Sequence, residues 1–393
     1  MDTKHYIAYF YDIVRKLNNA LDTKYFHVYV TILCATIIGI FFTPKLSSFI
    51  NPSGVFYFHG FWHDLKSQSE DLFHQNLFDN YPDCAHHRSM YFRLTFPIII
   101  KLFNLNIWGM LAVQKMFGLL LFFYSSKVFY KITKDKFTSL CFSLSCTYTY
   151  TFINSLTDNG GNLTGIDLAL LLMAVYYRNC ITIFITVFLA SFHDEKALIS
   201  SALVLLYWAI KENNNDTFTL RSFFNPFTIS IISSWVLYFV CRFTLQYIYE
   251  YPINTTCMGL PFIRLNIPIF HLFTFNALKA LWVLPAFFII DMCVKKNYLL
   301  LLGYSGIILI IFAVSASCHD FDRSLCHMFI TLFPALLSLV FYFNTKQWQF
   351  ISFIILIMCI LIPNYNIIML NLPISPIFIQ WLEIYFDAGK LIL

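Results

Sequence analysis

The sequence predicts an all-α, polytopic integral membrane protein with about eleven transmembrane helices, each needing about 20 apolar residues. Of its 393 residues, 59% are hydrophobic and only 12% are charged, whereas a soluble domain carries roughly 25% charged residues. The aromatic content of 19% is typical of helices that place Phe against lipid and Tyr and Trp at the interface. Apolar runs follow one another along the chain, so we expect residues 1–393 to form one integral membrane domain.

The charge and cysteine patterns argue against a nucleic-acid-binding protein and against a metal site built on cysteines. The net charge of +5 is dispersed without a basic run, so we expect the membrane as a partner and no nucleic acid. The 11 cysteines include neither a CxxC pair nor a Cys/His spacing typical of a metal site. The N-terminus carries charge before its first apolar run and lacks a small-residue cleavage site, which indicates an uncleaved anchor. The cysteine and histidine spacing therefore predicts no metal site.

The first expected span covers residues 27–43. The basic residues that precede it place the N-terminus in the cytoplasm by the positive-inside rule; they are Lys4, Arg15, Lys16 and Lys24. Residues 44–106 are expected to form a long first extracytoplasmic loop with helices at the membrane surface. Within this loop, 94–104 is apolar but shorter than the roughly 20 residues that a crossing needs, so it is expected to lie in the interface. The next span, 107–130, returns the chain to a lysine-rich inner face.

Nine further spans are expected near 137–155, 164–178, 180–192, 197–210, 227–248, 270–294, 298–316, 325–343 and 350–369. Three of them, between 164 and 210, are too short to cross a full bilayer of about 30 Å alone. They imply a thinned or water-filled region, or helices that stop at a cavity floor. Alternation of the spans places the C-terminal tail, 374–393, on the outer face.

Four clusters of ionisable residues lie between these spans, and the same alternation places all four on the outer face. They are His59–Arg93, Asp158 with Asp167, His193–Lys196 and His319–Arg323. Charges at the edge of a bilayer are costly unless they face water, a partner charge or a substrate. The clusters therefore predict a reaction centre on one side of the membrane. The clusters could instead be a solvated loop, tight turns and ion pairs that cap helices, with no part in a reaction. For Asp167, a favourable interaction with the helix dipole is the better explanation.

Individual residues in these clusters suit the handling of a hydroxyl and a phosphate. A loop carboxylate can act as general base, with Asp64, Glu70 and Asp71 as candidates. Arginine and histidine bind phosphate well. Candidate binding residues are His86, His87, Arg88, Asp194, Glu195, Lys196, Asp320, Asp322 and Arg323. Lys279 lies inside an apolar run, where it could reach a lipid phosphate unless 264–280 lies flat on the outer face.

Three short segments resemble bacterial multi-spanning glycosyltransferases of the GT-C type. These are Phe-His-Asp-Glu-Lys-Ala-Leu (192–198), His-Asp-Phe-Asp-Arg-Ser (319–324) ahead of a Phe-Pro-Ala-Leu-Leu span, and Arg-Leu-Thr-Phe-Pro (93–97) after an acidic first outer loop. The resemblance extends over the architecture of most of the chain. It departs from the family in two respects: the nearest acidic pair, Glu70-Asp71, lies deep in the loop, and the soluble outer domain that many members carry is absent.

The resemblance implies a GT-C-like fold and transfer of a sugar, with inversion, from a polyprenyl-phosphate or polyprenyl-pyrophosphate donor to a glycan or lipid-linked acceptor. It implies that Asp64, Glu70 or Asp71 is the base. Phosphate binding would fall to His86, His87, Arg88, Lys196 and Arg323. Asp194 and Glu195 would orient the sugar or an optional divalent cation, Mg or Mn. The expected location is a bacterial inner membrane with an extracytoplasmic active face.

Two alternatives stay open. An O-antigen or capsule polysaccharide polymerase shares the size, the aromatic richness and the large outer loop, and would rely on outer-loop arginines. A lipid-linked glycan flippase or secondary transporter would place its charged site near the midplane, between internal repeats. No convincing internal repeat is visible in the sequence, which favours an enzyme.

Overall fold

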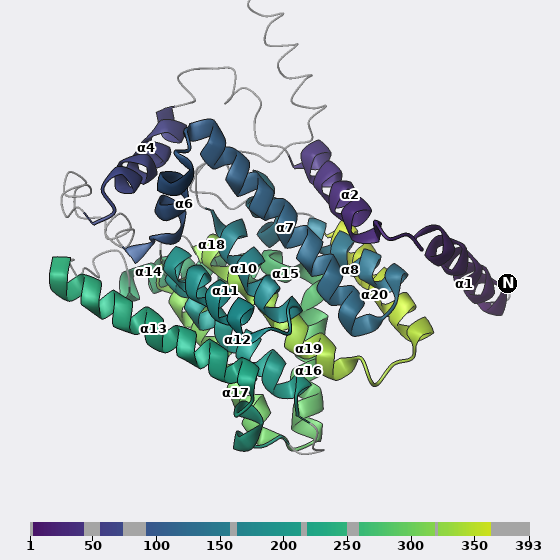
Figure 1. Cartoon of the computed structure of the whole chain (residues 1–393). Helices are drawn as coiled ribbons and strands as arrows, with labels where there is room; N and C mark the ends of the chain where they lie inside the picture. Colours follow the sequence, from purple (N-terminus) through teal and green to yellow (C-terminus); the bar gives the residue numbers. More distant parts are fainter. Residues whose placement is uncertain are drawn as a thin grey trace, which may run out of the picture.

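The structure, a computed structural model, describes residues 3–42, 56–73, 92–157, 163–213, 218–249, 259–318 and 321–362. These described residues form helices and no strand (Figure 1), which confirms the expected all-α class. Four helical segments are long and apolar enough to cross a membrane by length and composition: α7 (Ile107–Thr133), α13 (Pro226–Tyr249), α17 (Tyr298–Ala316) and the broken segment Leu260–Val294. These features fit a helical integral membrane protein.

The remaining helices occupy the other apolar runs. They are α1 (Thr3–Ala20), α2 (Phe26–Phe41), α4 (Phe56–Glu70), α6 (Thr95–Phe103), α8 (Lys136–Thr147), α9 (Tyr150–Thr157), α10 (Thr164–Tyr176), α11 (Cys180–His193), α12 (Glu195–Lys211), η2 (Leu220–Phe223), α14 (Leu260–Asn266), η3 (Ile267–Ile269), α15 (Phe270–Leu278), η4 (Lys279–Trp282), α16 (Val283–Val294), α18 (Phe321–Leu325), η5 (Cys326–Thr331), α19 (Leu332–Leu339) and α20 (Thr345–Leu361). Within the described residues, every expected span overlaps helical structure; residue 43 of the first span and residues 363–369 of the last lie outside them. The count of about eleven crossings, each of about 20 residues, stays a prediction.

The described part of residues 44–106, the predicted first outer loop, contains two short helices that pack on each other, α4 and α6. The ring centroids of Trp62 and Phe96 are 6.4 Å apart, and both side chains are buried. Thr95 donates a hydrogen bond to the Leu189 carbonyl of α11 at 2.7 Å, which fixes the start of α6 against the bundle. Helix α6 has 9 residues, so it is too short to cross, as its sequence predicts.

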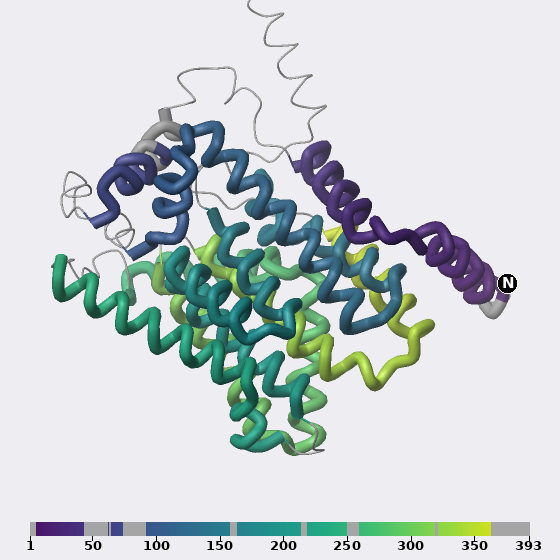
Figure 2. The backbone as a smooth tube through the Cα atoms, viewed as in Figure 1, coloured from purple at the N-terminus to yellow at the C-terminus, as the bar shows by residue number. Residues whose placement is uncertain are grey.

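Helix α10 explains how such short helices fit in a membrane protein. It has 13 residues, and all but Met173 and Tyr176 are buried. Its neighbours α7, α11 and α12 pack around it, so protein surrounds it rather than lipid and its length need not match the bilayer. The tube in Figure 2 shows the longer α13 along the outside of the bundle.

Close helix packing depends on glycine where α7 meets α9. A Cβ atom at Gly118 would lie 2.7 Å from the Ser155 carbonyl oxygen and 2.8 Å from a methyl group of Leu156. Because the carbonyl belongs to the backbone, it cannot move aside as a flexible side chain would. The chain therefore needs glycine at this position.

We expect Gly118→Ala to lower the free energy of unfolding by about 1–3 kcal/mol, the usual cost of overpacking a core. The measurement is an SDS titration of the protein in detergent. Gly306→Ala on α17 is the control, because its new Cβ would meet nothing within 4 Å. Equal stability of the two variants would contradict the packing argument.

Candidate active site

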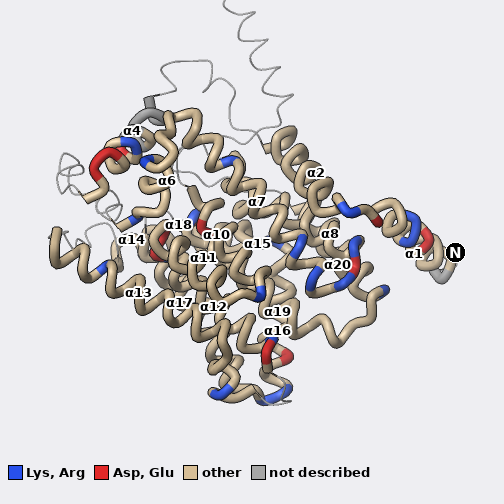
Figure 3. The backbone as a smooth tube through the Cα atoms, viewed as in Figure 1, with Lys and Arg blue, Asp and Glu red and all other residues tan. Residues whose placement is uncertain are grey.

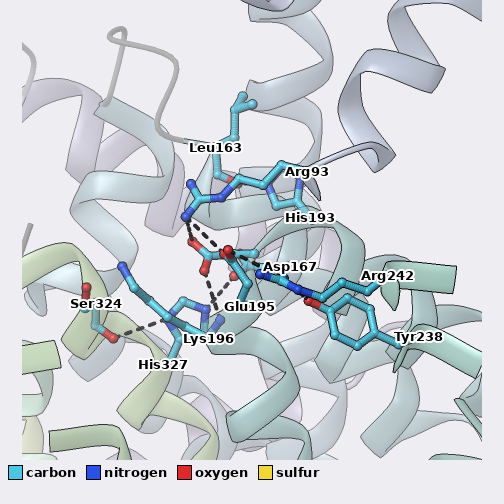
Figure 4. Close-up of polar contacts among 11 residues, drawn as sticks. Arg93, Leu163, Asp167, His193, Glu195, Lys196, Tyr238, Arg242, Ser324 and His327 are labelled. Carbon is cyan, nitrogen blue, oxygen red and sulfur yellow. Dashed lines mark hydrogen bonds and ion pairs between the residues drawn. The ribbon is translucent and has the colours of Figure 1, made fainter. Parts of the chain in front are cut away.

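A buried charged cluster lies where α10 and α12 begin and α11 ends (Figure 4). It comprises Arg93, Asp167, His193, Asp194, Glu195, Lys196, Arg242 and His327, and Arg323 joins it through its charge effect on Asp194; these residues come from segments far apart in the sequence. In Figure 3, acidic and basic segments meet near α10, α11 and α18 inside the bundle.

Arg93 joins two carboxylates at the centre of this cluster. Its Nη2 atom lies 3.3 Å from Glu195 Oε2 and 3.5 Å from Asp194 Oδ2. Arg242 approaches Glu195 from α13, with Nη1 at 3.8 Å from Oε1. Its guanidinium also lies 4.1 Å from the ring centroid of Phe92 and 2.6 Å from the Tyr238 hydroxyl. Two arginines from different segments thus converge on Glu195.

Asp194 is held by local structure as well as by charge. It is the N-cap of α12, and its Oδ1 accepts a hydrogen bond from the Lys196 backbone N–H at 2.9 Å. Burial alone would raise the pKa of Asp194, but the charges of Arg93 and Lys196 outweigh this effect and hold the pKa well below its usual range. Asp194 is therefore a fixed anion in the turn between α11 and α12.

Asp167 and His327 form the most buried ion pair of the cluster. His327 Nε2 lies 2.6 Å from Asp167 Oδ2, with side-chain exposures of 1% and 0%. His327 Nδ1 lies 3.2 Å from the Ser324 carbonyl oxygen. A carbonyl only accepts, so in this ring orientation Nδ1 carries a proton. A second proton is then shared between Nε2 and the carboxylate, which makes the pair neutral overall.

His193 fixes the start of α10. Its Nε2 donates to the Leu163 carbonyl oxygen at 3.0 Å, and Leu163 adopts a left-handed backbone with φ of 59°. The ring thus ties the end of α11 to the residue that precedes α10. This contact holds Asp167 and Asp194 in one region.

The cluster is recessed relative to the end of its neighbouring long helix. Arg242 lies seven residues before Tyr249, the last residue of α13, which corresponds to about 10 Å along the axis. Beside α13, helix α11 ends at His193 after only 14 residues. If α13 crosses the bilayer, the cluster lies below the membrane surface, at the level of lipid headgroups or deeper.

The predicted site residues separate into three groups. Asp194, Glu195, Lys196 and Arg323 belong to the cluster, and Asp322 precedes Arg323 on α18. Asp64, Glu70, Asp71 and Lys279 lie on other elements. His86, His87, Arg88 and Asp320 lie outside the described residues.

The three candidate bases lie on or just after α4, and they lie beside different parts of the neighbouring helix α6. Trp62 of α4 packs on Phe96 near the start of α6, whereas Lys101 Nζ contacts the Glu70 carbonyl oxygen near the end of α6. Arg93 precedes the start of α6. Along α4, Asp64 is two residues from Trp62 and therefore lies nearer the Trp62–Phe96 contact than Glu70 and Asp71, which are exposed at the end of the helix.

Lys279 is engaged elsewhere. Its side chain is buried at the break between α15 and η4, and its Nζ donates to the carbonyls of Cys359 at 3.3 Å and Ile362 at 2.8 Å. These carbonyls close the C-terminal end of α20, where a cation is favoured. A role in phosphate binding stays a prediction for this residue.

Five residues of the cluster were not among the predicted site residues: Arg93, Asp167, His193, Arg242 and His327. Arg242 carries a usable signal, since a charge within an apolar run is a functional candidate. His327 follows Arg323 by one helical turn but sits in an apolar stretch without a visible pattern. For Asp167, the helix dipole is not the whole explanation, because its carboxylate also binds His327.

Within the described residues, no group of three or more His, Cys, Asp and Glu side chains is arranged to hold a metal ion. No protein-family model, curated protein or solved structure matches this chain.

Proposed function

We propose that this chain is a membrane-embedded glycosyltransferase. It moves a sugar from a polyprenyl-phosphate or polyprenyl-pyrophosphate donor to a surface-glycan or lipid-linked acceptor on the extracytoplasmic face. The observation that carries this proposal is the convergence of Arg93, Arg242, Lys196 and Arg323 with two carboxylates in a recessed cluster of a helical membrane protein. Cations at this depth are suited to a lipid phosphate.

The reaction requires the protein mainly to position the donor and the acceptor. A lipid phosphate is already a good leaving group, so the enzyme needs a base for the acceptor and cations for the departing phosphate. The acceptor oxygen forms a bond to the anomeric carbon as the carbon–oxygen bond to the phosphate breaks. The acceptor proton passes to the base, and the electron pair stays on the phosphate.

Four residues of the cluster have a direct role in this scheme, together with a base from the predicted outer loop. Arg93 and Arg242 neutralise the phosphate while Asp194 and Glu195 hold the guanidinium groups and orient sugar hydroxyls. Asp64 is the base that the register of α4 on α6 favours over Glu70 and Asp71. The resemblance to GT-C enzymes supports the same assignment of an acidic first outer loop. A divalent cation, Mg or Mn, is optional in this scheme.

A glycan polymerase is the second candidate. It uses the same class of lipid-linked donor and relies on arginines. The cluster holds Arg93, Arg242 and Arg323, which favours a polymerase over a transporter. The two enzymes differ in product, since a polymerase extends its acceptor repeatedly whereas the transferase adds one sugar.

The test uses the full-length protein in nanodiscs with undecaprenyl-phosphate hexoses that carry a radiolabel in the sugar. We expect the label to leave the lipid phosphate and to appear as a single addition on acceptor glycans from bacterial membranes. Arg242→Gln is expected to lower this rate at least about 100-fold, on the scale of one lost transition-state donor. Arg178→Gln, at an exposed Arg178–Glu212 pair, is the control and should keep the rate.

The products decide among the candidates. A ladder of products would assign the polymerase instead. Donors that cross proteoliposome membranes with their label still on the phosphate would overturn enzyme function in favour of transport.

A further inference from the structure

A second group of cations lies at the opposite ends of α10 and α12 from the charged cluster. Lys211 ends α12, sixteen residues after Glu195 begins it, which corresponds to about 24 Å along the axis. Tyr176 ends α10, and Lys131 is in the last turn of α7. We call Lys127, Lys131, Tyr176, Trp208 and Lys211 the lysine–aromatic cluster.

Aromatic rings hold these lysines close together. Lys131 Nζ lies 5.0 Å from the Tyr176 ring centroid and 5.9 Å from that of Trp208, and Lys211 Nζ lies 4.7 Å from the same Trp208 ring. Lys127 Nζ lies 5.1 Å from the Tyr176 ring. Trp208 is buried and donates its indole N–H to the Ala174 carbonyl at 2.9 Å. A rigid indole thus holds two half-buried ammonium groups side by side.

Helix ends explain only part of this arrangement. Cations are favoured at helix C-termini, and Lys131 Nζ does donate to the Tyr176 carbonyl. Lys211, however, has its hydrogen bond to the Tyr207 hydroxyl at 3.4 Å. Burial and the neighbouring Lys131 lower the pKa of Lys211, which lies beyond the expected span, to about 8. Two like charges on one ring repel each other, and an anion between them would remove this cost.

The nearby carboxylate of Glu212 offsets only part of the charge of the lysines. Its charge favours protonated Lys211, but its Oε2 lies 2.8 Å from Arg178 Nη2, so it is shared with another cation. Lys131 and Lys211 then place two positive charges beside one indole ring, and Lys127 adds a third at the Tyr176 ring, which Lys131 also contacts. Phosphate binds to closely spaced cations of this kind, and basic pockets between transmembrane helices bind anionic lipid headgroups.

We propose that Lys131 and Lys211 bind a phosphate group between the ends of α7, α10 and α12. An anionic phospholipid is the source that the position in a membrane protein favours, and soluble phosphate is the other source of the same chemistry. The site is independent of the proposed glycosyl transfer, because no residue is shared between the two clusters.

The experiment measures lipid binding to the full-length protein in dodecyl maltoside by native mass spectrometry. The probes are dioleoyl phosphatidylglycerol, dioleoyl phosphatidylcholine and inorganic phosphate. We expect the wild type to prefer phosphatidylglycerol. Lys131→Gln with Lys211→Gln should weaken its binding by about 30-fold, on the scale that two lysines contribute to an anionic surface. Arginine at both positions should keep the preference.

Controls separate the site from general charge. Lys295→Gln with Lys296→Gln removes two exposed lysines elsewhere and should keep phosphatidylglycerol binding. If the double variant does not fold, Lys211→Gln alone should still reduce binding. Competition by inorganic phosphate would support the site and assign a soluble ligand. Equal binding of both lipids without a phosphate effect, or unchanged binding by the double variant, would overturn the proposal.

Discussion

Replacing Arg93 with Met is expected to lower the free energy of unfolding by about 3 kcal/mol, the lower end of the cost of breaking a buried ion pair. The change leaves Asp194 without its nearest cation, while Glu195 keeps Arg242 at 3.8 Å. The side chains of Arg93 and Asp194 are only 14% and 12% exposed, so water cannot fully replace the lost charge. An SDS titration in detergent measures the effect.

Two further variants test this explanation. Arg178→Met breaks the ion pair with Glu212, in which the two charged atoms are 2.8 Å apart and the arginine side chain is 64% exposed. This change should lower the free energy of unfolding by less than about 1 kcal/mol. Arg93→Lys should recover much of the stability, because a single nitrogen of Arg93 makes both carboxylate contacts. A loss for Arg93→Met no larger than that for Arg178→Met would show that the cluster is solvated rather than buried.

Replacing His327 with Leu is expected to have the largest effect on stability, a loss of about 3–5 kcal/mol. The change leaves the Asp167 carboxylate buried without the partner that lies 2.6 Å away. An uncompensated buried charge costs more than the intact pair contributes, because the carboxylate cannot regain its hydration. The free energy of unfolding of the variant in detergent measures this loss.

The double variant Asp167→Leu with His327→Leu separates charge from packing. We expect it to be more stable than His327→Leu alone, since an apolar replacement of a whole buried pair is often close to neutral. The interaction energy of the double-mutant cycle gives the strength of the pair. If the double variant were the least stable of the three, the loss would come from packing, and the ion-pair explanation would be wrong.

The placement of the helices was largely predictable from the sequence. Apolar runs such as 107–130 and 298–316 are helical as expected, because a chain surrounded by lipid must satisfy its backbone hydrogen bonds within each segment. The turn at His193–Lys196 was also visible, since four ionisable residues interrupt two apolar runs. The sequence did not explain why the helices between 164 and 210 are so short. The structure does so for α10, which is enclosed by protein.

The residues of the site were only partly predictable. Asp194, Glu195, Lys196 and Arg323 stand out in the sequence because they are charged and adjacent to apolar runs. Arg242 and His327 lie within such runs, so their neighbours in sequence say nothing about their partners. Asp64 and Glu70 look equivalent in the loop, yet α4 packs on α6 in a register that separates them.

The sequence by itself determined that this is a helical membrane protein whose charges gather between its apolar helices, because composition and apolar run length are local properties. Only the tertiary structure decided that Arg93 meets Glu195 and that Asp167 meets His327. Such contacts depend on how helices from distant segments pack and rotate against one another. No local pattern encodes that packing, since it follows from the shape of the whole core.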